Sequence, residues 1–145
     1  MFLGQYEHSI DEKGRLIVPA RYRELLISGA YISQGFDQNL MVETPDNFEK
    51  LANNVSLMSV TDPRSRDLHR LIFGSAELLE VDKTGRILIP QFLRQFAMLD
   101  SLAVIVGMGT HFEIWSPTLW APKRADISNG EINAKRYADL NLPIH

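Results

Sequence analysis

The sequence predicts an α+β protein in which two copies of one small unit complete each other. Three observations support this prediction. The chain has 145 residues, 45% of them hydrophobic and none of them cysteine, so one compact domain or two very small ones are expected without disulfide bonds. One sequence block occurs twice. Within each copy, β-rich segments alternate with segments that begin at a proline and show helical spacing.

The internal repeat aligns SIDEKGRLIVP at residues 9–19 with EVDKTGRILIP at residues 80–90, a shift of 71 positions. The match resumes at a shift of 72, where Phe48 lies over Trp120. Both blocks keep their order and spacing, which indicates a duplication. Since a unit of roughly 45 residues rarely buries a sufficient core alone, the two copies are expected to share one.

Four segments follow from the repeat. We expect the first repeat over residues 5–50, a linking helical segment over 51–75, the second repeat over 76–120 and a C-terminal tail over 121–145. The tail is weakly patterned, so we expect it to be partly helical, with a turn at Asn129-Gly130.

Each repeat begins with a predicted hairpin and a short helix. In the first copy, residues 6–10 and 15–18 are rich in β-formers and flank a turn in which Gly14 can adopt the left-handed conformation. Pro19 fixes φ at the first position of the following helix. The apolar face of this helix is expected to comprise Tyr22, Leu25 and Leu26.

A second hairpin follows in each repeat. It joins residues 30–36 to 40–43 in the first copy, and residues 102–108 to 112–115 in the second. The connecting segments contain the small and polar residues that favour turns.

Helices are predicted to close both copies and to link them. Thr44-Pro45 and Ser116-Pro117 each place a capping hydroxyl before a proline. Between the copies, Asp62 and Gly74 are suited to begin and end a helix. The apolar stripe of this linking helix is expected to comprise Leu68, Leu71 and Ile72.

Composition excludes several classes of function. Without cysteine, and with four histidines far apart in the sequence, no metal site is indicated, and no set of catalytic residues stands out. We therefore expect no enzyme activity, no cofactor and no small-molecule substrate. The apolar stretch at residues 102–108 is too short to span a membrane, and the first residues lack the pattern of an export signal, so a soluble cytoplasmic protein is expected.

The net charge of −3 argues against a generally basic nucleic-acid binder, so any such function must come from local clustering. Two cationic clusters are present, the acidic residues Asp37, Glu43, Asp46 and Glu49 lie between them in the sequence, and this arrangement can give one positive face. The clusters comprise Lys13, Arg15, Arg21 and Arg23 in the first copy, and Lys83, Arg86 and Arg94 in the second.

The element Asp-x-x-x-Arg occurs in both copies, as Asp11 to Arg15 and Asp82 to Arg86. Across the mouth of a hairpin the two side chains would face each other, with Cβ atoms about 5 Å apart. A guanidinium held in this way can donate two hydrogen bonds to guanine in the major groove, while a neighbouring lysine neutralises phosphate. The candidate DNA-binding residues are Asp11, Lys13, Arg15, Asp82, Lys83 and Arg86.

The alternative for this element is a weak ion pair at the rim of a turn, present twice only because the unit was duplicated. For Arg21, Arg23 and Arg94, solvated helix positions are expected more often than phosphate contacts. The cationic residues of the linking helix could serve as phosphate contacts or in a subunit interface. They are Arg64, Arg66 and Arg70.

Taken together, the N-terminal MFLG, the two segments at residues 11–19 and 82–90, and the basic bridge at residues 64–74 strongly resemble the MraZ family. The resemblance runs from Met1 to about Trp120. It implies two tandem domains of the AbrB/SpoVT type, whose swapped hairpins interleave into one pseudo-symmetric β-barrel with flanking helices.

The resemblance also implies a function. Members of the family are bacterial transcriptional regulators that bind short G-rich direct repeats in double-stranded DNA, upstream of their own division and cell-wall gene cluster. They assemble into ring-shaped homo-oligomers and are expected in the cytoplasm, associated with the nucleoid. The competing interpretation is a ring-forming scaffold that binds protein partners through residues 64–70 without direct DNA readout.

Overall fold

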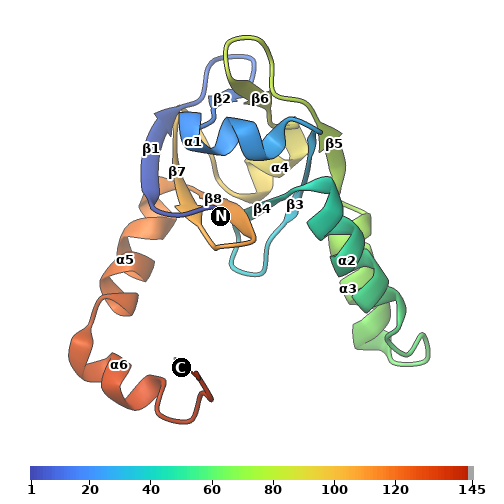
Figure 1. Cartoon of the computed structure of the whole chain (residues 1–145), viewed down its shortest axis with the longest axis vertical. Helices are drawn as coiled ribbons and strands as arrows, with labels where there is room; N and C mark the ends of the chain where they lie inside the picture. Colours follow the sequence, from blue (N-terminus) through green and yellow to red (C-terminus); the bar gives the residue numbers. More distant parts are fainter. Residues whose placement is uncertain (144–145) are drawn as a thin grey trace.

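The computed structural model describes residues 1–143 (Figure 1). Its strands are β1 (Gln5–Ser9), β2 (Arg15–Ile17), β3 (Ala30–Gln34), β4 (Leu40–Glu43), β5 (Glu77–Leu79), β6 (Arg86–Leu88), β7 (Leu102–Gly107) and β8 (His111–Trp115). Its helices are α1 (Ala20–Arg23), which continues into the 3-10 turn η1 (Glu24–Leu26), α2 (Pro45–Ser56), α3 (Pro63–Phe73), α4 (Gln91–Phe96), α5 (Pro117–Ile127) and α6 (Gly130–Arg136). The predicted α+β class is confirmed.

The two repeats exchange strands. Six strands form one antiparallel sheet in the order β1-β7-β8-β4-β3-β5, and β2 pairs with β6 in a separate ribbon. As a result β1 of the first repeat pairs with β7 of the second, and β5 of the second pairs with β3 of the first. Neither repeat has a complete sheet by itself, as the small size of the unit predicts.

The exchange corrects the predicted first hairpin. Residues 6–10 and 15–18 do flank a turn, but only a single bridge between Ile10 and Leu16 and the hydrogen bond from Asp11 N to Arg15 O, 3.0 Å, join them as strands. Their ladders are made with β7 and β6 instead. Pairing β2 with β6 places Leu16 and Ile87, both 0% exposed, in one shared core, which a hairpin confined to one repeat would not do.

The strand pairing has an approximate two-fold symmetry. In the ribbon, Arg15 pairs with Leu88 and Ile17 with Arg86, on either side of the central pair Leu16 and Ile87. The large sheet is symmetric in the same way about its β4–β8 pair. The ladders of residues 1–143 form two separate sheets, so the closed barrel is not confirmed.

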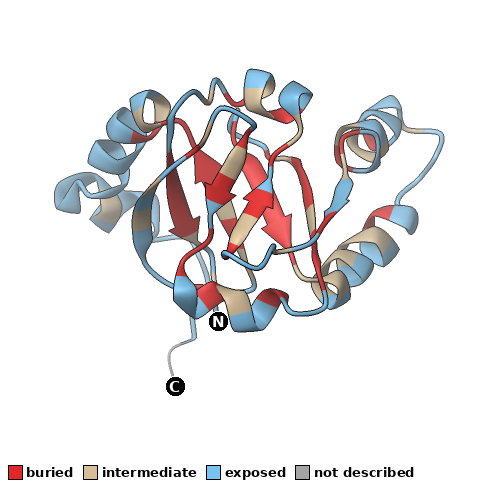
Figure 2. Cartoon of the chain, turned by 90° about the horizontal axis from the view of Figure 1, so that it is seen from above, coloured by how far each residue is buried: buried red, intermediate tan, exposed pale blue. Residues whose placement is uncertain are grey.

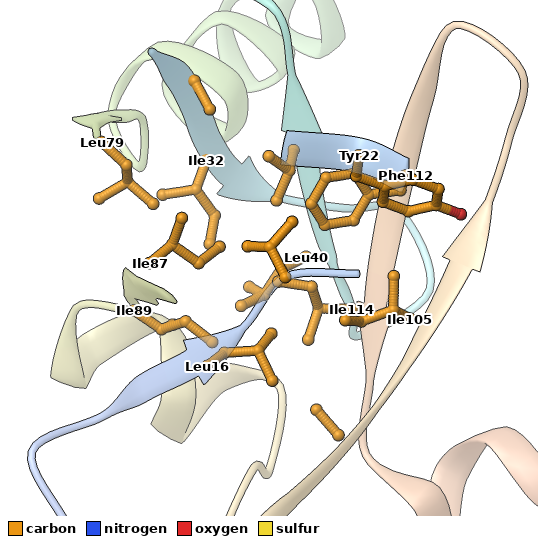
Figure 3. Close-up of a cluster of buried hydrophobic side chains, with 14 of the residues drawn as sticks. Leu16, Tyr22, Ile32, Leu40, Leu79, Ile87, Ile89, Ile105, Phe112 and Ile114 are labelled. Carbon is orange, nitrogen blue, oxygen red and sulfur yellow. The ribbon is translucent and has the colours of Figure 1, made fainter. Parts of the chain in front are cut away.

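The core lies between the large sheet, the β2–β6 ribbon and the short helices α1 and α4 (Figure 2). Figure 3 shows side chains of both repeats meeting there, among them Leu16 and Ile87 of the ribbon. Tyr22 packs on Phe2 and Phe112 at centroid distances of 4.9 and 5.1 Å, and its hydroxyl donates to Leu3 O at 2.7 Å. Burial raises the pKa of Tyr22 to about 12. Leu25, in contrast, is 40% exposed, because the chain tightens into η1 and turns it away from the core.

The predicted closing and linking helices are present. Thr44 Oγ1 accepts from Asn47 N at 3.2 Å at the start of α2, and Asp62 Oδ1 accepts from Arg64 N at 2.9 Å at the start of α3. Ser116 precedes α5 without a capping hydrogen bond from its side chain. α3 ends at Gly74 as predicted, and Ile72 is the fully buried member of its apolar stripe.

The tail is helical. α5 continues beyond residue 121, and Asn129 begins α6, which lies away from the body of the molecule (Figure 1). The last two residues of the predicted tail segment lie outside the described residues. No helix within residues 1–143 is both long enough and apolar enough to cross a membrane.

Candidate nucleic-acid interface

The first candidate element is a turn organised by one carboxylate. Asp11 Oδ1 accepts from the backbone N–H groups of Lys13, at 3.0 Å, and Arg15, at 2.9 Å. Asp11 Oδ2 accepts from Arg15 Nε at 2.6 Å. Gly14 closes the turn with φ +91, the left-handed conformation that the sequence predicts. One side chain therefore fixes both the turn and the guanidinium.

The second repeat builds the same arrangement. Asp82 Oδ1 accepts from Thr84 N at 3.0 Å, Thr84 Oγ1 at 2.9 Å and Arg86 N at 2.9 Å, and Asp82 Oδ2 accepts from Arg86 Nε at 3.0 Å. These bonds, the backbone N–H of Arg86 first, lower the pKa of Asp82 to about 2. The backbone N–H of Arg15 likewise lowers the pKa of Asp11. Both carboxylates therefore stay ionised far below neutral pH.

Strand exchange brings the two elements together. Because β2 pairs with β6, Arg86 lies next to the first turn, with Nη1 at 3.7 Å from Asp11 Oδ2. The ribbon and both turns form one end of the molecule, at the top of Figure 1. All six predicted residues thus belong to one continuous surface, although they come from segments about 70 positions apart.

The arginine side chains point outward but are held. Leu16 and Ile87 face the core, so the alternation along each strand places Arg15 and Arg86 on the outer face of the ribbon. Their side chains are 33% and 29% exposed. Each donates Nε–H to its aspartate. Within residues 1–143, the Nη groups of Arg15 donate to no protein acceptor, whereas Nη1 of Arg86 lies 3.7 Å from Asp11 Oδ2.

Two further arginines support the turns from below. A Cβ atom at Gly14 would lie 2.6 Å from Arg94 Cζ, and one at Gly85 would overlap Arg23 Cζ. Arg23 also donates from Nε to Val18 O at 3.0 Å. Each repeat therefore places an arginine under the turn of the other repeat. Arg23 and Arg94 are packing residues here, and solvated positions are the wrong description of them.

This support was missed at the sequence level, where Arg23 and Arg94 were placed in clusters of positive charge and interpreted as solvated helix positions or, less often, phosphate contacts. A signal was available, since Arg23 and Arg94 follow Gly14 and Gly85 at the same interval. An interval alone does not tell which turn an arginine reaches. Each arginine reaches the turn of the other repeat because the repeats exchange strands, and this exchange joins segments that are far apart in the sequence.

The lysines supply the surplus of positive charge. Asp11 and Asp82 balance Arg15 and Arg86, so the four residues together are neutral. Lys13 and Lys83 are exposed on the turns beside them, and Glu12, exposed on the first turn, offsets Lys13, so that a surplus of one positive charge remains. The interface is therefore a small, mostly balanced cluster with a lysine at each turn, rather than a broad basic face.

The arginines of α3 lie elsewhere. α3 projects from the side of the body away from the ribbon end (Figure 1). Arg64 pairs with Asp62 and Arg70 with Asp67, both at 2.9 Å, and Arg66 donates to a backbone oxygen. This helix is therefore not part of the ribbon surface. Within residues 1–143, no cluster of three or more His, Asp or Glu side chains is arranged to hold a metal ion.

Comparison with known proteins identifies relatives across nearly the whole chain. A family model described as "MraZ protein, putative antitoxin-like" matches residues 1–71 and again residues 72–139. The double match agrees with the internal duplication.

Individual relatives carry the same family name. The chain is 45% identical to a transcriptional regulator MraZ of Roseiflexus castenholzii over 143 residues, covering 98% of this chain and 100% of the relative. It is 40% identical over 141 residues to the transcriptional regulator MraZ of Thermomicrobium roseum, covering 97% and 99%. The protein of that name from Dictyoglomus thermophilum is 41% identical over 139 residues, covering 93% and 95%.

Proposed function

The chain belongs to the MraZ family, and we propose that it regulates transcription by binding double-stranded DNA through the β2–β6 ribbon and its two turns. The observation that carries this proposal is the pair of guanidinium groups, each held by its own aspartate, on the outer face of one two-stranded ribbon. A two-stranded ribbon fits the major groove of B-form DNA.

The chemistry of the ribbon suits guanine. An arginine can donate two parallel hydrogen bonds to guanine O6 and N7. Because Nε of both Arg15 and Arg86 is bonded to aspartate, the Nη groups would make these bonds, those of Arg86 from a position where Nη1 lies 3.7 Å from Asp11 Oδ2. The two residues are diagonal neighbours across the ribbon, so their Cβ atoms lie about 7 to 8 Å apart. This spacing matches about two base-pair steps of roughly 3.4 Å each. One chain would thus read one short G-rich element, while Lys13 and Lys83 contact phosphates.

Several chains acting together would extend this reading to repeats. We propose a ring-shaped homo-oligomer that presents ribbons to successive G-rich direct repeats, upstream of its own division and cell-wall gene cluster. Linked sites gain affinity through effective concentration without any new contact. Exposed apolar side chains outside the ribbon are consistent with contacts between copies. On the turn after α2 these include Leu57, Met58 and Val60, and beyond α5 they include Ile132, Tyr137, Leu140 and Leu142. The assembled protein would act in the cytoplasm, at the nucleoid.

One observation favours a second candidate, a protein-interaction scaffold. Within residues 1–143, no side chain buries the apolar residues of the α2–α3 turn, which stay exposed. Because the arginines of α3 bond to residues of their own segment, a protein partner would dock on the apolar turn rather than on those arginines. A partner captured without nucleic acid, at an affinity unaffected by salt, would favour the scaffold.

The proposal is tested by titrating the protein with a duplex of tandem G-rich repeats and with the same duplex containing 7-deazaguanine, which lacks the N7 acceptor. Arg15→Ala and Arg86→Ala should each weaken binding to the natural duplex by about 1 to 3 kcal/mol and relax base choice. The variant carrying both changes should no longer distinguish the two duplexes. Arg15→Lys keeps the charge but loses the planar fork of the guanidinium, so it should relax base choice as Arg15→Ala does.

Arg64→Ala is the matched control, because it removes the same positive charge as the ribbon substitutions. The Arg64 side chain is 92% exposed and lies on α3, outside the ribbon. Arg64→Ala should leave both affinities unchanged. Binding that is insensitive to 7-deazaguanine, or unaffected by both ribbon substitutions, would refute the assignment of guanine reading to the ribbon. Light scattering of the same samples measures the mass, and a monomer at the concentrations that bind DNA would refute the ring.

A further inference from the structure

The outer face of the β2–β6 ribbon carries two aliphatic side chains in addition to the two arginines. Ile17 and Leu88 are 38% and 52% exposed, while their strand neighbours Leu16 and Ile87 are fully buried. Solvent-facing positions of a sheet that covers a core on one side are usually polar. Both repeats place an aliphatic residue at the equivalent outward position.

The register joins each aliphatic residue to an arginine. Leu88 lies directly opposite Arg15, and Ile17 directly opposite Arg86. Residues opposed in this way have Cβ atoms about 4.5 to 5.5 Å apart. The face is therefore an alternating pattern of guanidinium and hydrocarbon groups, repeated by the approximate two-fold symmetry of the ribbon.

Resting on the proposed function, we propose that Ile17 and Leu88 read thymine next to the guanines contacted by Arg86 and Arg15. In the major groove, thymine is distinguished by its 5-methyl group, which has no hydrogen-bonding capacity and is recognised by apolar contact. An aliphatic side chain beside a guanine-reading arginine is placed to bury that methyl group. The specificity of each chain then includes a T·A pair within about two steps of a guanine.

The hydrophobic effect gives this contact its expected size. Burying one methyl group changes affinity by about fourfold. The free energy of one methyl contact is small beside that of an arginine that donates two hydrogen bonds to guanine. The two aliphatic residues of one chain together contribute twice that free energy. It also persists at high salt, because it involves no phosphate and releases no counterion.

Deoxyuridine provides a direct test, because it differs from thymidine only in lacking the methyl group. The probes are a set of duplexes with tandem GGG elements. Each duplex places a T·A pair at one of the two positions before or the two positions after the guanines, and each has a counterpart in which that pair is U·A. The wild-type chain should bind at least one T·A duplex about fourfold more tightly than its U·A counterpart. In Ile17→Ala or Leu88→Ala this ratio should fall toward one, and in the double variant it should be one.

Leu25→Ala is the matched control, since Leu25 is a comparably exposed aliphatic residue, 40% exposed, outside the ribbon. It should keep the wild-type ratio. Because the readout is a ratio between two duplexes measured on one protein sample, a partial loss of folding in a variant cancels. A ratio of one in the wild-type chain at every position, or an unchanged ratio in the double variant, would overturn the inference.

The two proposals fail in different ways. Sensitivity to 7-deazaguanine without any difference between T·A and U·A duplexes would retain guanine reading by the arginines and remove the role of Ile17 and Leu88. Absence of binding to any G-rich duplex would refute the proposed function itself. If the Ile17→Ala or Leu88→Ala variant formed a smaller oligomer than the natural chain in solution, these residues would contact another copy. That result would also overturn the inference.

Discussion

Glu43 is a buried carboxyl group whose ionisation should limit the stability of the fold at neutral pH. It ends β4, is 7% exposed, and lies across the strands from His111 of β8, with Oε1 at 3.7 Å from Nδ1. Burial raises the pKa of Glu43 to about 7 and lowers the pKa of His111. Each shift disfavours the charged form, so this is not a strong ion pair at neutral pH.

The perturbation is Glu43→Gln, which removes the ionisation and keeps the shape. Below pH 4.5, the ordinary value, both folded and unfolded chains carry the proton and no cost arises. As the pH rises toward 7 the unfolded chain loses its proton first, so the free energy of unfolding of the natural chain falls. The difference between a pKa of about 7 and one of 4.5 amounts to about 3 kcal/mol once both states are ionised.

Urea unfolding followed by circular dichroism at intervals between pH 4 and pH 8.5 measures this effect. The difference in stability between Glu43→Gln and the natural chain should move in favour of the variant by about 2 to 3 kcal/mol across this window. Any constant cost of burying the amide cancels in that change. Parallel stability profiles for the two chains would show that Glu43 titrates normally, and would refute the argument from burial.

Three other predictions concern the ribbon and its turns. Gly14→Ala should lower the free energy of unfolding, measured with urea, by more than Gly109→Ala does. Both glycines have a positive φ, which costs an alanine about 1 to 2 kcal/mol, but of the two only Gly14 packs against an arginine. Lys13→Ala and Lys83→Ala should each reduce the slope of log affinity against log salt by about 0.9 per chain bound, and an unchanged slope would exclude phosphate contacts. Asp82→Asn should weaken discrimination against 7-deazaguanine in DNA titrations, because the carboxylate no longer holds the guanidinium; full discrimination would show that the ion pair is dispensable.

Local features of the fold were predictable from residue patterns. The interleaving of the two copies was expected only from the resemblance to the family, and the partner of each individual strand was not predictable. The left-handed conformation of Gly14 and the capping roles of Thr44 and Asp62 follow from residues within four positions of each other. A β-rich run identifies a strand but carries no information on its neighbour. The predicted hairpin at residues 6–18 was therefore wrong in its pairing although its turn was right.

The candidate site shows the same division. The two Asp-x-x-x-Arg elements could be recognised from the repeat, and their aspartate-to-arginine bonds follow from the turn. Their convergence on one ribbon depends on the exchange of strands between repeats. So do the crossed supports that Arg23 and Arg94 give to the turns, which explains why charge clustering alone misassigned them.

The balance of charge at the ribbon determines the energetic character of the proposed DNA contact. Two carboxylates offset two guanidinium groups, and the whole chain carries a net charge of −3, so the salt-dependent attraction that dominates non-specific binding is weak. Hydrogen bonds to guanine are retained in this proposal, because each carboxylate accepts a hydrogen bond from Nε of its own arginine, and the Nη groups, of which Arg86 Nη1 lies 3.7 Å from Asp11 Oδ2, remain as donors. An arginine held in this way gives up affinity for random DNA and keeps discrimination between bases. Since one chain then binds weakly, tight occupancy of a regulatory site requires several ribbons on tandem elements, which connects the neutral cluster to the proposed assembly.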